Sequence, residues 1–262
     1  MHIGTCDAMV VVEHENALAL GGTRLFDQAV QDGSGRRLWR SSHLEQRVGL
    51  ADNAPFDPKI MADEDLKGRV ALVTGASRGI GLATAIQLAR SGAAGVTITS
   101  RKAENLETAV EQMMAAGVDE DSILPIAARA DVDEDAERAA AETLERFGAV
   151  DILVPNAGGP PPGTFASTPV DAYPAALELN LLSIVAMCKA AVPAMQERRW
   201  GRVVAITSLS VRQPIAQLIL SNTARAGATG FLKTLAREGE RQRAALGDLD
   251  ADGDLDAFVA ER

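Results

Sequence analysis

Three closely spaced glycines stand where the chain could bind a phosphate. Gly75, Gly79 and Gly81 lie between an apolar run, residues 69–74, and a helical pattern at 79–91. Glycine allows a tight turn and lets an anion approach the backbone, and the first turn of a helix offers unpaired N–H groups and a favourable dipole. The spacing is GxxxGxG, not GxGxxG, but it joins a strand to a helix, which is the context such a motif requires. The sequence therefore predicts a turn that binds a diphosphate.

Apolar β-branched runs alternate with helical patterns through most of the chain. The expected strands are 69–74, 95–99, 123–128, 152–155 and 202–207, and the expected helices are 79–91, 103–116, 133–147, 170–198 and about 217–242. Near-continuous apolar strands separated by helices indicate a parallel sheet covered on both faces. With right-handed crossovers, the prediction is an α/β fold with a doubly wound parallel sheet, Rossmann-like, in strand order of about 3-2-1-4-5.

Several motifs in this order resemble the short-chain dehydrogenase/reductase family over residues 66–238. Thr74–Gly81 matches the family's TGxxxGIG turn, and the other matching positions are Asp131-Val132, Asn156-Ala157-Gly158, Asn180 and Ser208. The resemblance implies a nicotinamide dinucleotide cofactor. The residues that it implies for cofactor binding are Gly75, Ser77, Arg78, Gly79, Ile80, Gly81, Ser100, Arg101, Asp131, Val132, Asn156, Ala157 and Gly158.

The charge at the end of the second predicted strand indicates which nicotinamide cofactor is bound. NAD-binding proteins place an acid there for the ribose hydroxyl. This chain has Ser100, Arg101 and Lys102 instead, with Arg78 in the glycine turn. A guanidinium offers a bidentate fork to a phosphate. We therefore predict NADP in preference to NAD; a solvated helix start is the alternative interpretation of these cations.

The resemblance also implies a catalytic row, from which this chain departs. Family members use serine, tyrosine and lysine with a supporting asparagine, and here Asn180 and Ser208 match. The tyrosine position holds Ser221, 13 residues after Ser208, and the lysine position holds Arg225. A serine hydroxyl is a weaker acid than a phenol, and arginine stays protonated, although it can still bridge ribose hydroxyls. The only tyrosine, Tyr173, lies upstream of Asn180 and cannot take the role.

Two functions from different classes follow. The first is an NADP-dependent oxidoreductase of a small-molecule carbonyl/alcohol pair, similar to 3-oxoacyl-carrier-protein reductases. The second is a dinucleotide-binding protein of the same family that is catalytically impaired or inactive, from a truncated gene. By resemblance, helices 170–198 and 217–242 would form the interface of a homodimer or homotetramer.

The segments that flank the expected domain at residues 61–242 have a different composition. Residues 1–60 have no sustained periodicity and are expected to be an irregular extension, with Met61 as a candidate natural start. Residues 243–262 form an acidic tail, in which Asp248, Asp250, Asp252 and Asp256 have the spacing of a calcium loop; a solvated tail is the simpler interpretation. The family's last two strands are not recognisable, so the fifth strand is expected to expose an edge.

The overall composition excludes some classes of function. The net charge of −10 disfavours a general nucleic-acid or anionic-membrane binder. No apolar run approaches about 18 residues, so no transmembrane helix is expected. Cys6 and Cys188 indicate neither a disulfide framework nor a metal cluster, and Cys188 is expected to be a buried core thiol. A cytoplasmic location, without bound metal, is the expectation.

Overall fold

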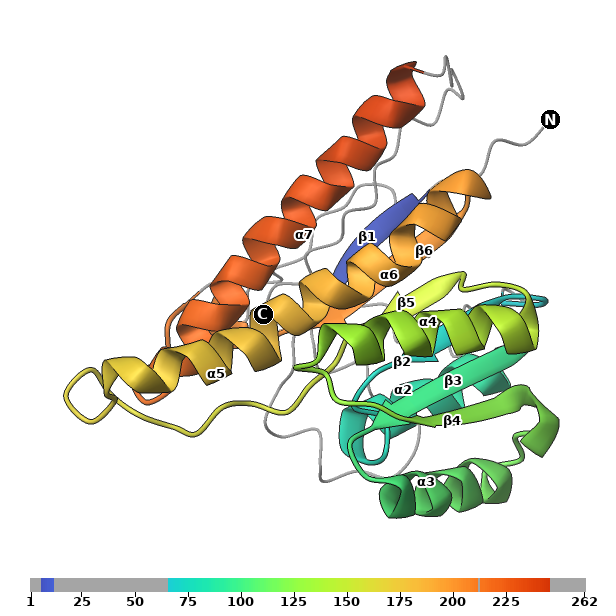
Figure 1. Cartoon of the computed structure of the whole chain (residues 1–262), viewed down its shortest axis with the longest axis horizontal. Helices are drawn as coiled ribbons and strands as arrows, with labels where there is room; N and C mark the ends of the chain where they lie inside the picture. Colours follow the sequence, from blue (N-terminus) through green and yellow to red (C-terminus); the bar gives the residue numbers. More distant parts are fainter. Residues whose placement is uncertain (1–5, 12–65, 212, 246–262) are drawn as a thin grey trace, which may run out of the picture.

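A six-stranded parallel sheet forms the centre of the computed structural model (Figure 1). The structure describes residues 6–11, 66–211 and 213–245, so the candidate start at Met61 and the four tail aspartates lie outside the described residues. The strands are β1 (Cys6–Val11), β2 (Val70–Val73), β3 (Gly95–Ser100), β4 (Ile123–Ala127), β5 (Ile152–Val154) and β6 (Gly201–Ile206). Their spatial order is β1-β6-β5-β2-β3-β4. The five predicted strands thus have the predicted order.

Helices cover the sheet on both faces. They are α2 (Gly79–Arg90), α3 (Ala103–Ala115), α4 (Asp133–Phe147), α5 (Tyr173–Leu177), α6 (Ser183–Glu197) and α7 (Ile219–Ala245), with a π-helical turn, η6 (Glu178–Leu182), between α5 and α6. Short 3-10 turns η4 (Glu120–Ser122), η5 (Val170–Ala172) and η7 (Leu209–Val211) complete the described elements. All five predicted helices are present, and η5 to α6 together form the long one.

Alternation of side chains along the strands divides the core into two clusters. Leu72 and Leu153 lie in the cluster formed with α4, α6 and α7. Their neighbours Ala71, Val73 and Ile152 lie in the cluster formed with α2 and α3. Because helices cover both faces of the sheet, apolar residues occupy most positions of its strands. The buried Cys188 belongs to the first cluster, as predicted.

The first strand corrects two expectations. Residues 6–11, within a segment expected to be irregular, form β1, which pairs in parallel with β6 from Cys6↔Gly201 to Val11↔Ile206. The edge of β6 is therefore covered by β1. The expectation that this edge would be exposed, which followed from the absence of the family's last two strands, is wrong. No strand follows β6 in the part of the chain that the structure describes.

One helical stretch is apolar for a structural reason. Val170–Glu197 is long and apolar enough to cross a membrane by length and composition alone. However, Met187, Ala191 and Met195 on this stretch are buried in the core against the sheet. Packing on the sheet accounts for much of its apolar character.

Asp151, directly before β5, connects the beginnings of β2, β5 and β6. Its carboxylate accepts a hydrogen bond from the N–H of Val70 at 2.9 Å and pairs with Arg198 at 3.3 Å and Arg69 at 3.6 Å. The Asp151 side chain is only 6% exposed.

We expect Asp151→Ala to lower the free energy of unfolding by about 3 kcal/mol. The buried Val70 N–H would lose its acceptor, and Arg69 and Arg198 would lose the carboxylate with which they pair. The midpoint of thermal unfolding, followed by circular dichroism, should fall by about 6 °C or more. Glu111→Gln, on the exposed face of α3, is the control and should leave it unchanged. An equal effect of both substitutions would contradict this role.

Candidate dinucleotide site

The glycine turn adopts a backbone that only glycine accommodates easily. Gly75 and Gly79 have φ values of +57° and +58°. A Cβ atom on Gly81 would lie 2.5 Å from the carbonyl oxygen of Gly75, and one on Gly75 would lie 2.7 Å from that of Asn156. At Gly79 a Cβ would meet nothing within 4 Å, so this glycine borders open space at the start of α2. The turn is therefore closely packed at Gly75 and Gly81 and open at Gly79.

Thr74 and Asn156 lock this turn to the end of β5. The Thr74 hydroxyl donates to the Asn156 carbonyl and accepts from the Asn156 N–H, both at 2.8 Å. The Asn156 carboxamide donates to the carbonyls of Thr74 at 3.2 Å and Gly75 at 3.1 Å. The sequence analysis did not assign a role to Thr74, although its position directly before the first glycine was the available signal.

The N-terminus of α2 is suited to an anion. Arg78 is its N-cap, its side chain makes no capping hydrogen bond, and the first turn contains no acidic residue. The N–H groups of Gly79, Ile80 and Gly81 precede the first i−4 bond of the helix, so they have no carbonyl partner within it. Ser77 is held beside this turn by a 3.0 Å hydrogen bond to Ser100 at the end of β3. These features fit a diphosphate.

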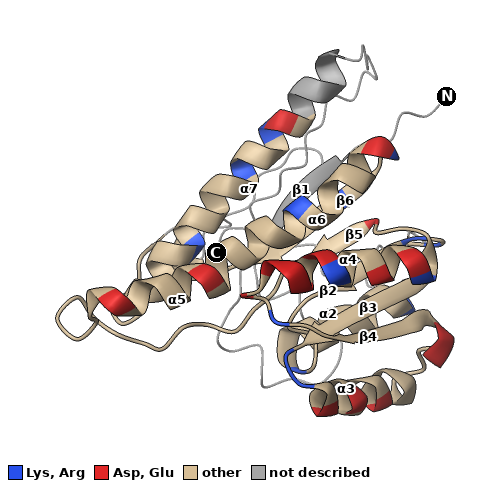
Figure 2. Ribbon diagram, in the orientation of Figure 1, with Lys and Arg blue, Asp and Glu red and all other residues tan. Residues whose placement is uncertain are grey.

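Basic residues lie beside this turn. The segment that leads into α3 is basic, whereas α3 and α4 themselves carry many acidic residues (Figure 2). Arg78, Arg101 and Lys102 are exposed, and the structure describes no ion pair for any of the three. They are available to a phosphate outside the glycine turn.

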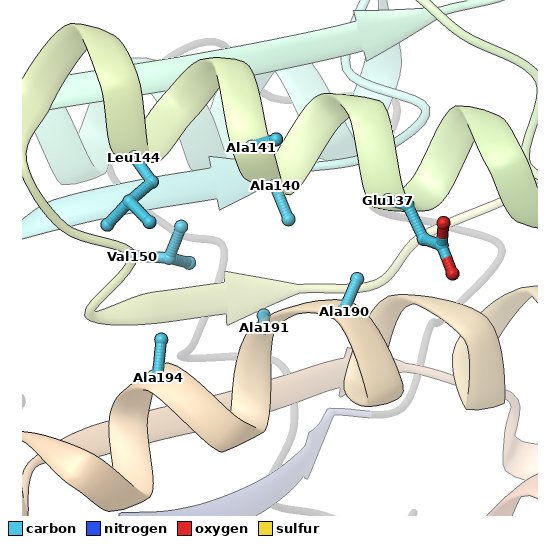
Figure 3. Close-up of a pocket in the computed structure, with 8 residues that line it drawn as sticks. All are labelled: Glu137, Ala140, Ala141, Leu144, Val150, Ala190, Ala191 and Ala194. Atoms are coloured by element: carbon cyan, nitrogen blue, oxygen red, sulfur yellow. The ribbon is translucent and has the colours of Figure 1, made fainter.

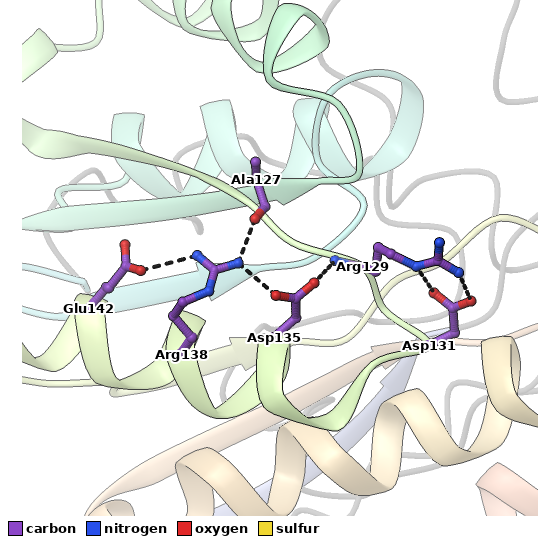
Figure 4. A network of polar contacts seen from close by, with 6 residues as sticks. All are labelled: Ala127, Arg129, Asp131, Asp135, Arg138 and Glu142. Carbon is purple, nitrogen blue, oxygen red and sulfur yellow. Dashed lines mark hydrogen bonds and ion pairs between the residues drawn. The ribbon is translucent and has the colours of Figure 1, made fainter.

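Asp131, which the resemblance assigns to adenine, is held by a neighbouring cation (Figure 4). Arg129 donates to its two carboxylate oxygens, from Nε at 3.2 Å and from a terminal nitrogen at 2.7 Å. These hydrogen bonds lower the pKa of the Asp131 carboxyl, and the charge of Arg101 lowers it further. The sequence analysis did not single out Arg129, because the pairing depends on how the chain turns after β4.

A second carboxylate continues this network along α4. Asp135 accepts from the Arg129 N–H and from the Arg138 guanidinium, each at 2.7 Å, and Arg138 also donates to the Ala127 carbonyl (Figure 4). The pKa of Asp135 is lowered, chiefly by the bond from the Arg129 backbone. Val132 starts the helix by accepting from Asp135 N at 3.2 Å. The network fixes the loop that joins β4 to α4.

Asn180 lies in the π-helical turn η6 and is only 2% exposed. Its amide nitrogen donates to the Gly158 carbonyl at 2.9 Å, while its Oδ1 is buried without a described partner. Such π-helical turns occur frequently at functional sites. An unpartnered buried oxygen leaves one acceptor available to a water or a substrate group.

Arg225 is buried on α7, with 4% exposure. Its described hydrogen bonds go to the carbonyls of Ile206 at 2.9 Å, Thr207 at 3.2 Å and Ala157 at 3.3 Å. The structure therefore brings Arg225 and Asn180 to the same turn, where they donate to Ala157 and Gly158.

The two serines of the predicted row sit on either side of the turn that follows β6. Ser208 is half-buried, and its hydroxyl accepts from the Ser210 N–H at 3.2 Å. Ser221 is buried, with 7% exposure, in the first turn of α7. The hydroxyls of Thr207 and Ser210 are buried without described partners. The hydroxyl-bearing residues Thr207, Ser208 and Ser210 thus follow the carboxyl end of β6, and the catalytic roles of Ser208 and Ser221 stay predictions.

A groove between α4 and α6 lies apart from these residues (Figure 3). Its lining is largely alanine, with Glu137 as its one charged side chain. Among the described residues, no cluster of three or more histidine, cysteine, aspartate or glutamate residues could hold a metal ion.

The fold and the site together define a dinucleotide-binding α/β domain. The family model for short chain dehydrogenases matches residues 69–245. The rabbit (Oryctolagus cuniculus) protein dehydrogenase/reductase SDR family member 4 is 35% identical over 176 residues, which are 67% of this chain and 66% of that protein. The 3-oxoacyl-[acyl-carrier-protein] reductase of Synechocystis is 32% identical over 173 residues, covering 66% of this chain and 69% of that protein.

A solved structure agrees with these sequence matches. An actinorhodin polyketide ketoreductase variant with NADPH has a TM-score of 0.62 and 33% identity, and the match covers 66% of each chain. The chain therefore belongs to the short-chain dehydrogenase family, as the motifs predicted. It spans about two thirds of the length of the relatives that it matches.

The glycine turn gives a matched pair of substitutions. Gly81→Ala places a methyl group against the Gly75 carbonyl, so we expect it to remove the rise in unfolding temperature that NADPH produces in the unchanged protein. Gly230→Ala, where a Cβ meets nothing within 4 Å in α7, should bind NADPH normally and gain about 0.5–1 kcal/mol in stability. NADPH titrations followed by thermal unfolding measure both. Normal NADPH binding by Gly81→Ala would contradict the tight turn.

The network on α4 predicts a pH dependence. A carboxyl whose pKa is lower in the folded state stabilises the fold above its unfolded pKa, which is about 3.9 for aspartate, and that stability is lost as the pH falls through the folded pKa. Asp135→Asn should therefore lower the unfolding temperature at pH 7 by about 2–4 °C, with the difference shrinking as the pH falls below about 4 and lost once the pH is below the folded pKa. Glu107→Gln on α3 is the control. A difference that persists unchanged at pH 3 would contradict the assignment.

Proposed function

We propose that this chain is an NADP-dependent oxidoreductase acting on a carbonyl/alcohol pair. The observation that carries the proposal is the glycine turn, locked by Asn156 and open at the N-terminus of α2, with Arg78 and Arg101 beside it. The turn would hold the diphosphate, and the exposed guanidinium groups would pair with the 2′-phosphate that distinguishes NADP from NAD. A carboxylate, which would repel that phosphate, is absent from Ser100 to Lys102.

The carboxyl ends of β5 and β6 would hold the reacting groups. When bound, the reduced nicotinamide supplies a hydride. Ser208 would donate a hydrogen bond to the substrate oxygen, and Asn180, with its unpartnered Oδ1, would hold a water. Ser221, or a water beside it, would complete the proton transfer. Because a serine hydroxyl is a weak acid, this last step should limit the rate.

The substrate class rests on similarity. The match to 3-oxoacyl-[acyl-carrier-protein] reductase and to a polyketide ketoreductase favours a ketone on an acyl chain. Two residues before α5 are highly exposed: Phe165, at 89%, and Val170, which begins η5, at 86%. Exposed apolar side chains in this segment are consistent with an apolar substrate.

A second candidate function is nucleotide binding without turnover. The described hydrogen bonds of Arg225 go to main-chain carbonyls, and arginine cannot exchange protons at ordinary pH. With Ser221 at the tyrosine position, the site retains the cofactor-binding turn and lacks a strong proton donor. This observation favours a binding protein or an impaired enzyme.

We also propose that the chain acts as a homodimer or homotetramer in the cytoplasm. In the apolar helical stretch Val170–Glu197, 44% of the most apolar window is buried, so apolar surface remains on that stretch. Leu182 is 49% exposed there. A second copy of the chain would cover this surface.

The choice of cofactor is tested by reversing one charge. Arg101→Asp should weaken NADPH binding about tenfold or more without weakening NADH binding, because the removed cation pairs with the 2′-phosphate and a carboxylate at this position can accept a hydrogen bond from the ribose hydroxyl of NADH. Isothermal titration calorimetry with both nucleotides measures these affinities. Lys102→Gln tests separately whether the neighbouring cation contributes to NADPH binding. Unchanged NADPH affinity in Arg101→Asp would make the NADP assignment wrong.

The two candidate functions are separated by turnover. We expect NADPH to raise the unfolding temperature and to be oxidised slowly in the presence of acyl-chain ketones, followed by absorbance at 340 nm. Ser208→Ala, which removes the hydrogen bond to the substrate oxygen, should lower this rate about tenfold or more without changing NADPH affinity. A rise in unfolding temperature with no oxidation of any ketone supports the binding protein, and no rise at all contradicts both candidates.

A further inference from the structure

The parallel pairing of β5 and β6 ends just before the candidate site. The strands pair at Ile152↔Arg202 and Leu153↔Val203, and the Ile206 N–H donates to the Pro155 carbonyl at 3.0 Å. Beyond that bond, β5 leads into the turn that contains Asn156 and β6 leads into Thr207. No backbone hydrogen bond between the two segments is described beyond this point, which lies at the carboxyl edge of the sheet, where ligands of doubly wound folds bind.

Arg225 bridges the two segments. One terminal nitrogen of its guanidinium donates to Ile206 and Thr207 on the β6 side, and the other donates to Ala157 on the β5 side. The planar guanidinium carries donors on two separate terminal nitrogens, whereas a lysine ammonium has one nitrogen. The side chain is buried, so these bonds are formed away from bulk water.

The turn after β5 is thus held from two sides by independent groups. Thr74 locks its first residue to the glycine turn. Arg225 and Asn180 hold the next two residues from α7 and η6. Loss of Arg225 should therefore loosen the β6 side and leave the glycine turn intact.

We propose that Arg225 is a positioning residue that sets the distance between the ends of β5 and β6 for the nicotinamide half of the cofactor. The inference rests on the proposed nucleotide binding. In a doubly wound sheet a dinucleotide crosses the point where the strand order reverses, here between β2 and β5. The basic residues that follow β3 fit the adenosine half, so the β5–β6 side takes the other half. Arg225 acts there through Ala157 and Thr207 and transfers no proton.

Comparing the affinities of two ligands distinguishes effects on the two halves of the site. NADPH spans both, whereas 2′,5′-ADP contains only the adenosine half with its phosphates. For Arg225→Met, calorimetry should give NADPH affinity reduced about tenfold or more and 2′,5′-ADP affinity within about twofold of the unchanged protein. Arg225→Lys, which keeps the charge but carries all its donors on one nitrogen, should also lose NADPH affinity while retaining 2′,5′-ADP affinity. Arg237→Met, an exposed position on α7, is the control and should bind both ligands normally.

The outcomes distinguish this inference from the proposed function. Full NADPH affinity in Arg225→Lys would overturn the bridging role, because two separate terminal nitrogens would then not be needed to hold the strand ends. Equal losses for both ligands in Arg225→Met and Arg225→Lys would overturn it in favour of general support of the fold. If the unchanged chain binds neither ligand, the proposed function fails and the inference fails with it.

Discussion

The close contact between Asn156 and the glycine turn is the constraint on which the site depends. The carboxamide of Asn156 occupies space that a Cβ atom on Gly75 or Gly81 would fill, and it donates to two carbonyls of the turn. This contact joins the carboxyl ends of β2 and β5 at the point where the strand order reverses. It also supports the turn from which α2 begins. Without this close approach the sheet could still form, but the anion-binding end of α2 would lose its support.

The short turn after β5 connects this phosphate side to the candidate reaction side. Thr74, Arg225 and Asn180 come from three elements and hold three successive residues of it. The charges are distributed along the same edge of the sheet: exposed arginines stand at the ends of β2 and β3, and one buried guanidinium stands between β5 and β6. An extended ligand with several phosphates at one end and a neutral ring at the other matches this distribution. The departures from the family's catalytic row, Ser221 and Arg225, lie on the β5–β6 side, away from the turn that would bind the diphosphate.

The sequence predicted what depends on local patterns. Buried β-branched runs and helical periodicity located all five strands and five helices of the predicted domain, and the position of the glycines located the turn. It did not predict β1, because six residues without a sustained period become a strand only by pairing with β6. Nor did it predict that Arg225 donates to strand-end carbonyls or that Arg129 holds Asp131. Those contacts depend on where distant elements meet and on which rotamer fits the space between them.

A crystal structure of the chain with NADP⁺ tests the central claim most directly. The account predicts electron density for the diphosphate at hydrogen-bonding distance from the N–H groups of Gly79 to Gly81, with Asn156 unmoved. A structure in which the dinucleotide binds elsewhere, or in which this turn is rearranged with its amides turned inward, would contradict it.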